Sequence, residues 1–180
     1  SIIIPIYNGD YWISRCFRSI LNQTAVNVLD FEICVCNDAS TDKTATLLGD
    51  WQGLFSSNGV TLKIFNNPNG SPGGVGYAKN RGVDTSTGDF FDDVMLPNRI
   101  LRQYERARKE TNYAIIGCQF RREPENSTMR YTKWANSLSQ DQLNQQVFTS
   151  HGPTVIMPTW FCHRKVYDRN FMDTIGKGAS

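Results

Sequence analysis

Three short runs of strand-forming residues alternate with two longer amphipathic segments in the first third of the chain. The runs occupy residues 2–6, 31–36 and 60–65, and they read IIIPI, FEICVC and VTLKIF. The segments between them, residues 10–23 and 39–51, carry apolar side chains at helical spacing. A strand followed by a helix does not turn back as a hairpin, so the next strand runs parallel to it. This order predicts an α/β fold with a mostly parallel central sheet and helices on both faces.

The remaining segments make more local predictions. In residues 10–23 one broad helical stripe is expected to face the core, and it contains Trp12, Ile13, Cys16, Phe17, Ser19, Ile20 and Leu21. Ser40 or Thr41 is expected to cap the second helix. Further along, we expect a short helix near residues 75–83, a charged helix in 98–111, a strand in 113–120 and an extended apolar segment in 154–167.

Composition limits the classes of protein to consider. The 180 residues are 39% hydrophobic, which is enough to form the core of one domain. The net charge of +2 neither demands nor excludes a polyanionic partner, so any contact with nucleic acid must come from a local patch. No run of about 18 apolar residues is present to span a bilayer. The five cysteines lack zinc-ligand spacing, which favours a reducing compartment. We therefore expect a soluble, cytoplasmic protein with no membrane partner.

Polar residues follow the predicted strands at four places: Tyr7-Asn8, Asn37-Asp38, the segment 73–81, and Asp92-Asp93. An open α/β sheet binds its ligand at the carboxyl ends of its strands, which is where these residues are expected. Each element alone has an ordinary explanation. Asn-Asp after a strand is usually a turn or a helix cap, GGVG lacks the lysine and serine of a P-loop, and adjacent carboxylates often mark a solvated strand end.

Four motifs occur in this order along the chain: SIIIPIYN, VCNDASTDKT, GVGYAKNRG and TGDF…DDV. Taken in order, they resemble the inverting family 2 glycosyltransferases of the GT-A type over about the first hundred residues. The resemblance implies a UDP-sugar site made by Pro5, Tyr7, Asn8, Asp38, Lys79 and Asn80. Asp38 would accept the uracil N–H, and Lys79 would face the nucleotide or diphosphate. Asp92 and Asp93 would hold Mn²⁺ or Mg²⁺, which neutralises charge on the departing UDP.

The chain departs from the family pattern at two places. Only Phe90 and Phe91 separate Gly88-Asp89 from Asp92-Asp93, where the family has a further strand of about five apolar residues and an Asp-x-Asp-Asp motif. We expect either a variant or an omission of residues there. The family's catalytic base, the aspartate of a Glu-Asp pair, is expected just after Ser180. We therefore expect one glycosyltransferase domain over 1–180 that is incomplete at its C-terminus and inactive by itself, with a nucleotide-sugar-binding half (1–95) and an acceptor-side half (96–180).

A narrower resemblance concerns the acceptor. It is carried by five segments: YAKN, DDVMLPNR, IIGC, NSTMRYTKW and QVFTSHGPTVIMPTWF. These segments resemble the animal galactosyltransferases that act on queuosine in tRNA, and the similarity extends through Phe161. It implies UDP-galactose as donor and tRNA as acceptor, with contacts from Arg121, Arg122, Arg130, Lys133, Trp134 and Trp160. From the residues alone, it is equally expected that both tryptophans are core and the cations a solvated face.

Two other functions remain open from the sequence: a transferase that moves N-acetylglucosamine from its UDP derivative to a glycan, and a non-catalytic nucleotide- or RNA-binding module. The sequence leaves the oligomeric state open.

Overall fold

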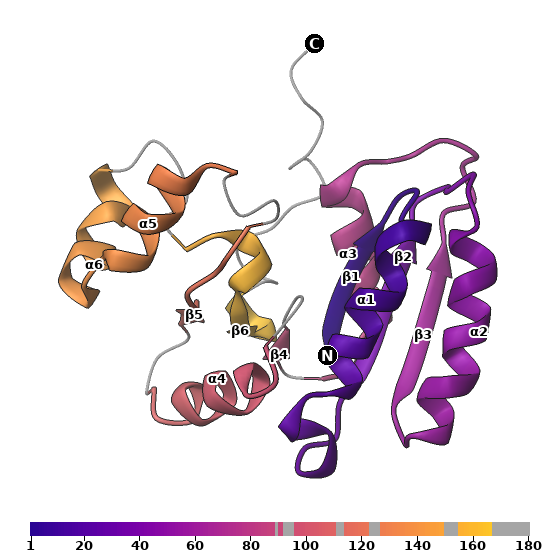
Figure 1. The fold of residues 1–180 in the computed structure, drawn as a ribbon, viewed down its shortest axis with the longest axis horizontal. Helices are drawn as coiled ribbons and strands as arrows, with labels where there is room; N and C mark the ends of the chain where they lie inside the picture. Colours follow the sequence, from indigo (N-terminus) through magenta and orange to yellow (C-terminus); the bar gives the residue numbers. More distant parts are fainter. Residues whose placement is uncertain (89, 92–95, 111–113, 123–126, 150–154, 167–180) are drawn as a thin grey trace.

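The computed structural model describes residues 1–88, 90–91, 96–110, 114–122, 127–149 and 155–166, and the structural statements below concern those residues. Figure 1 shows a parallel sheet with its helices in one part of the molecule, and short strands with further helices in the other. No helix in the described part is long and apolar enough to cross a membrane.

The parallel sheet has the strand order β1-β2-β3. Its strands are β1 (Ile2–Ile6), β2 (Glu32–Asn37) and β3 (Thr61–Asn66), and each pair is parallel. The intervening helices are α1 (Asp10–Leu21) and α2 (Thr44–Ser57), and α3 (Val75–Thr85) follows β3. The predicted strand–helix alternation is therefore confirmed.

Side chains that alternate along the strands bury against different helices. Ile4 of β1 belongs to a core cluster with Phe17 of α1 and Phe55 of α2. Its neighbour Ile3 points to the opposite face and clusters with Val83 of α3. Successive side chains of a strand project to opposite faces, so α1 and α2 cover one face and α3 covers the other. The α/β fold with helices on both faces of a parallel sheet is confirmed.

A second, smaller sheet contains β4 (Phe90–Phe91), β5 (Ile115–Ile116) and β6 (Phe161–His163) in the antiparallel order β4-β6-β5. The prediction of a strand over 113–120 was therefore too long. The backbone N–H and carbonyl of Phe120 bond instead to the side chain of Asn136, and the Gln119 side chain bonds to the Asn136 carbonyl, so neither residue joins the sheet. The predicted extended segment in 154–167 was also wrong in part, since it contains η2 (Met157–Thr159) and a helical turn beginning at Arg164.

The described chain has three further helices, α4 (Arg99–Ala107), α5 (Met129–Ser137) and α6 (Gln140–Thr149), and the short η1 (Thr24–Asn27). The predicted charged helix in 98–111 corresponds to α4. Within the stretch 121–146, to which sequence analysis assigned no secondary structure, the chain forms α5 and most of α6. In Figure 1, α5 and α6 lie at the end of the molecule away from the parallel sheet.

Buried glutamines connect the two parts of the molecule. Gln23, which is 3% exposed, donates from Nε2 to the carbonyl of Leu96 at 2.8 Å. Gln103 of α4 donates to the carbonyls of Ile116 at 2.9 Å and Thr159 at 3.0 Å. Because both amides are buried, each of these bonds also removes an unsatisfied polar group. They hold α4 between η1 and the antiparallel sheet.

Two local predictions about α1 and α2 were wrong. Trp12 is 56% exposed, because it precedes the buried stripe of Ile13 and Phe17 and lies about 100° around the helix from Ile13. The N-cap of α2 is Lys43, and it is Asp42 that accepts the Thr44 N–H at 2.9 Å.

A buried carboxylate fastens the amino edge of the parallel sheet. Glu32 accepts bonds from the Ser1 hydroxyl at 2.6 Å and the Gly88 N–H at 3.2 Å, and it forms an ion pair with Lys63. Burial raises the pKa of Glu32, but bonds from Lys63, Ser1 and Thr87 outweigh it and lower that pKa to about 2. The carboxylate is therefore ionised and ties the chain start, β3 and residues 87–88 to β2.

Candidate functional site

The loops that follow β1 and β2 interlock at the carboxyl edge of the parallel sheet. The Asn8 N–H donates to Oγ of Ser40 at 2.9 Å, and Oδ1 of Asn8 accepts the Thr41 N–H at 2.8 Å. Asn8 has a φ of 49° and Ala39 a φ of 59°. Non-glycine residues in this left-handed region are strained and persist where surrounding contacts hold them, often at functional sites. The loops after β1 and β2 are therefore bonded to each other at this edge.

The carboxylate of Asp38 is the centre of this edge. It is 3% exposed, and Oδ1 accepts bonds from Nδ2 of Asn67 at 2.6 Å and from the Gly73 N–H at 2.9 Å. Its Oδ2 accepts the Gly74 N–H at 2.8 Å. Gly74 has a φ of 89°, which the tight turn into α3 requires and glycine adopts without a steric penalty. Asp38 thus fastens the glycine loop over the end of β2.

One acceptor position of this carboxylate is left by the bonds described. Each carboxylate oxygen offers about two lone pairs, and Oδ2 takes the single bond from Gly74. An imide N–H, such as that of uracil, matches such a position. The uracil-binding role of Asp38 stays a prediction.

Asparagine side chains form hydrogen bonds that connect the ends of β2 and β3 at this edge. Nδ2 of Asn37 donates to Oδ1 of Asn66 at 3.0 Å, and the hydroxyl of Tyr77 donates to Oδ1 of Asn67 at 3.4 Å. Asn67 also donates to the Ser71 carbonyl at 3.0 Å. Sequence reasoning missed Asn67, although its position directly after β3, at the same edge as Asp38, was the signal that would have found it.

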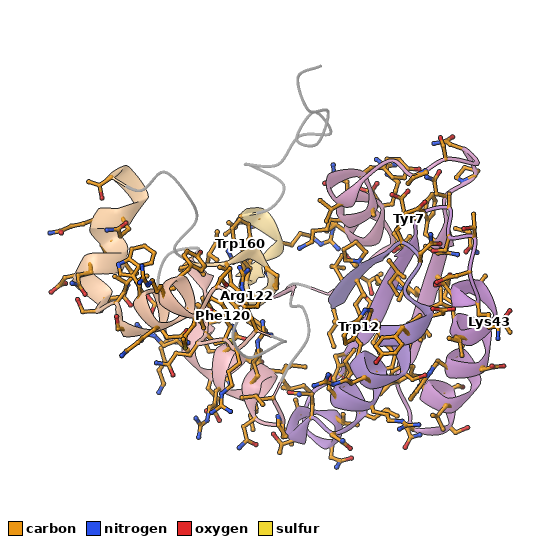
Figure 2. The ribbon with its side chains drawn as sticks, turned by 45° about the horizontal axis from the view of Figure 1, so that its top comes forward. Tyr7, Trp12, Lys43, Phe120, Arg122 and Trp160 are labelled. Atoms are coloured by element: carbon orange, nitrogen blue, oxygen red, sulfur yellow. The ribbon has the colours of Figure 1, made fainter. Side chains whose placement is uncertain are left out.

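The predicted donor residues fall into two groups. Tyr7, which is 52% exposed, and Asn8 lie with Asp38 at the carboxyl edge, and Pro5 lies one residue before the end of β1. Lys79 and Asn80 lie midway along α3, which begins beside Asp38. The structure thus gathers Tyr7, Asn8 and Asp38 at one edge and leaves the α3 pair farther from it along the helix. Figure 2 labels Tyr7 in the same part of the molecule as Trp12 and Lys43.

The thiol of Cys36, next to this site, is not a candidate nucleophile. Burial, with a smaller contribution from the Asp38 carboxylate, raises the pKa of Cys36 to about 11. The thiol is therefore protonated at neutral pH, and thiolate chemistry requires the deprotonated form.

The predicted metal ligands Asp92 and Asp93 lie outside the described residues. In the part of the chain that is described, no group of three or more His, Cys, Asp or Glu side chains is arranged to hold a metal ion. The metal site remains a prediction.

Most of the predicted acceptor residues share one surface. Arg121 and Arg122 are exposed, as are Arg130, Lys133 and Trp134 of α5, and Trp134 is 41% exposed. The cations form a solvated face, as one alternative expected, but Trp134 is not core. Trp160 is half-buried before β6 and donates from Nε1 to the Val155 carbonyl at 2.7 Å, so it belongs to a different element.

Two aromatic residues that sequence reasoning missed complete this surface. Cζ of Arg122 lies 5.9 Å from the ring centroid of Phe120 and 5.5 Å from that of Tyr131. Aromatic residues interleaved with basic ones were the available signal. We call Phe120, Arg122, Tyr131 and Trp134 the arginine–aromatic patch. Figure 2 labels Phe120 and Arg122 in the part of the molecule away from Tyr7.

Comparisons with known proteins place this chain in a family. The family model described as glycosyl transferase family 2 matches residues 1–171. An uncharacterised glycosyltransferase of Rickettsia conorii is 32% identical in an alignment of 176 residues, which covers 91% of this chain and 27% of that protein. The chondroitin synthase of Pasteurella multocida is 34% identical over 121 residues, covering 64% of this chain and 12% of that protein. The chain therefore spans only about a quarter or less of these curated relatives.

Solved structures share the fold. The structure of S. aureus TarS in complex with UDP matches with a TM-score of 0.68 at 17% identity, covering 98% of this chain and 51% of that one. The mannosyltransferase PcManGT from Pyrobaculum calidifontis, in complex with GDP-Man and Mn²⁺, matches with a TM-score of 0.56 at 15% identity, covering 88% of this chain and 48% of that one. With its GT-A-like α/β architecture and a family match over nearly its whole length, the chain belongs to glycosyl transferase family 2.

Proposed function

We propose that this chain is the donor-binding part of an inverting glycosyltransferase that takes galactose from UDP-galactose and transfers it to queuosine in tRNA, in the cytoplasm. The observation that carries the donor half of this proposal is the carboxyl edge built around Asp38, whose carboxylate is fixed by Asn67 and two backbone N–H groups. The TarS structure with UDP supports a uridine nucleotide as ligand of this fold.

Each donor contact has a chemical reason. Tyr7 and Pro5 border the uracil, and Tyr7 offers a half-exposed aromatic ring for it. Oδ2 of Asp38 accepts the uracil N–H beside its bond to Gly74. Lys79, with Asn80, faces the diphosphate, where a cation stabilises the charge that develops on the leaving group.

The adjacent carboxylates Asp92 and Asp93 are oxygen ligands suited to Mn²⁺ or Mg²⁺. A bound divalent ion would neutralise charge on the departing UDP. The Mn²⁺ in the PcManGT structure supports this choice. In the transfer step, the acceptor oxygen forms a bond to the anomeric carbon while the bond from that carbon to the diphosphate oxygen breaks. The acceptor proton goes to a general base of the intact protein.

Two observations support tRNA as the acceptor. They are the narrower sequence resemblance and the exposed cations Arg121, Arg122, Arg130 and Lys133. A second candidate is transfer of N-acetylglucosamine from UDP-N-acetylglucosamine to a glycan, and the similarity to chondroitin synthase supports the glycan as acceptor. A third candidate is a module that binds nucleotide or RNA without turnover.

The test uses the full-length protein with UDP-galactose and tRNA that contains queuosine, followed by nucleoside mass spectrometry. We expect one added hexose on queuosine and none on tRNA that lacks it. If hexose is absent from tRNA while UDP-N-acetylglucosamine and a glycan acceptor give product, the second candidate is correct. If neither acceptor reacts although UDP binds, the module that binds without turnover is correct.

A further inference from the structure

Asn136 of α5 clasps the extended segment that precedes Arg121. Its Oδ1 accepts the Phe120 N–H at 3.1 Å, and its Nδ2 donates to the Phe120 carbonyl at 2.8 Å. Nε2 of Gln119 donates in turn to the Asn136 carbonyl at 3.0 Å. Both polar groups of the Phe120 backbone are thus fixed to α5, as a neighbouring strand would fix them. These bonds determine the position from which the side chain of Arg122, two residues later, projects.

The clasped segment places a guanidinium on a row of aromatic rings. Arg122 stands within 6 Å of the rings of Phe120 and Tyr131, at 5.9 and 5.5 Å. The ring centroids of Phe120 and Tyr131 are 6.3 Å apart, and those of Tyr131 and Trp134 are 5.9 Å apart with an interplanar angle of 42°. The guanidinium near these rings carries five N–H donors in a planar fork that can bind phosphate oxygens. The patch therefore combines an aromatic surface with directed donors for an anion.

Exposed cations are sequence neighbours of the patch residues. Arg121 lies between Phe120 and Arg122, Arg130 precedes Tyr131 and Lys133 precedes Trp134, and all three cations are exposed. An unpaired nucleotide matches this combination, because its base can stack on the rings while its own and neighbouring phosphates meet the cations. A duplex hides its base faces, and an uncharged glycan gains nothing from the cations.

We infer that the arginine–aromatic patch is a preformed seat for one unpaired nucleotide of an RNA loop, and that Asn136 is the positioning residue that builds it. This inference rests on the proposed function only in taking RNA as the ligand. Phe120, Tyr131 and Asn136 are its additional residues, and galactosyl transfer is not needed to test it.

The first experiment measures anisotropy of a fluorescein-labelled RNA hairpin with an unpaired loop, at several KCl concentrations. Arg122→Ala should weaken binding about tenfold and lower the salt slope by about 0.7, the contribution of one phosphate on a single strand. Arg122→Lys should keep the slope but lose several-fold in affinity, because an ammonium lacks the planar fork. Tyr131→Leu should cost about fivefold to a hundredfold, as expected for one stacked base.

The chain offers a matched control for these variants. Cζ of the exposed Arg108 lies 5.8 Å from the ring of Tyr104 at the end of α4. Arg108→Ala removes the same charge and the same kind of ring contact outside the patch. It should leave RNA affinity within about twofold of the wild type.

The positioning role of Asn136 is tested by a double-mutant cycle. Asn136→Leu keeps the side-chain volume but removes both bonds to Phe120, so it should weaken RNA binding and leave UDP affinity unchanged. In that background Arg122→Ala should cost less than about twofold, because the guanidinium has already lost its placement. If Asn136 serves only general stability, the cost of Arg122→Ala will be the same in both backgrounds, and the melting temperature alone will fall.

The possible results separate this inference from the proposed function. If Arg122→Ala and Tyr131→Leu bind the hairpin as tightly as Arg108→Ala does, the seat is refuted even when queuosine is galactosylated. A paired duplex that binds as tightly as the hairpin refutes base stacking. A chondroitin oligosaccharide that displaces the RNA and depends on Tyr131 identifies a glycan seat instead. Hairpin binding that depends on the patch, without hexose transfer to tRNA, supports the seat and refutes only the proposed acceptor.

Discussion

Substitution of Asp38 by asparagine tests the donor site most directly, because the change removes a charge and one acceptor while keeping the side-chain shape. The carboxylate receives three bonds: Asn67 and Gly73 donate to Oδ1, and Gly74 donates to Oδ2. An asparagine can keep its oxygen at the Oδ1 position, which preserves the first two bonds. Its amide nitrogen then faces the Gly74 N–H, donor against donor.

The magnitude follows from the exposure of the groups that lose partners. A buried donor without an acceptor costs about 1–3 kcal/mol, but Gly74 is an exposed residue and water can reach its released N–H. The lower end of that range, about 1–2 kcal/mol, is therefore expected for the free energy of unfolding. UDP should lose about 1–3 kcal/mol of binding free energy, or about 5- to 150-fold in affinity, because the uracil N–H would meet an amide nitrogen instead of a carboxylate oxygen.

Calorimetric titration with UDP and urea unfolding measure the two effects separately. Asp84→Asn is the control, since Asp84 is an exposed acid on α3 whose ion pair with Arg81, at 3.0 Å, should contribute no more than about 1 kcal/mol. If Asp38→Asn loses stability but binds UDP within about twofold of Asp84→Asn, the carboxylate only supports the glycine loop. That result would refute its role in binding uracil.

Three other predictions follow from single residues. Because the pKa of Glu32 is lowered from 4.5 to about 2, its carboxylate should contribute about 3 kcal/mol of stability above pH 4.5, and this stability should be lost as the pH falls towards 2. The difference in unfolding free energy between wild type and Glu32→Gln should therefore shrink between pH 4.5 and about pH 2, and a constant difference would contradict this. Gly82→Ala should destabilise the protein by about 1–3 kcal/mol in urea unfolding, because an added Cβ would lie 2.6 Å from Cγ2 of Ile3. Gly53→Ala is the control and should stabilise α2 slightly, because an added Cβ there would have no atom within 4 Å. Equal effects of the two substitutions would show that α3 can move away from β1. In the intact protein, Mn²⁺ should tighten UDP binding and Asp92→Asn should abolish that gain, so a metal response unchanged by the substitution would leave Asp92 as a solvated strand end.

Local patterns predicted much of the parallel sheet but little of the second half. The apolar runs of β1, β2 and β3 are four or more residues long, so strand periodicity identifies them. Strands β4 and β5 have two residues each, which is too short for any periodicity to appear. They exist as strands because β6 lies between them and pairs with both.

The candidate site divides in the same way. The sequence motifs were sufficient to predict Tyr7, Asn8 and Asp38 at one edge, because parallel strands that alternate with helices bring their carboxyl ends together. They did not predict that Asp38 holds a glycine loop 35 residues away, or that Asn67 shares the task.

The sequence by itself determined the class of fold, the family and the edge at which the donor should bind. These depend on local periodicity and on short motifs, both of which are properties of neighbouring residues. Only the tertiary structure decided the partners of the buried polar groups: Gly73 for Asp38, Thr87 for Glu32, and Asn136 for the backbone of Phe120. Such bonds join residues 16 to 55 positions apart, and they form only where register, loop path and helix placement bring a donor within about 3 Å of an acceptor.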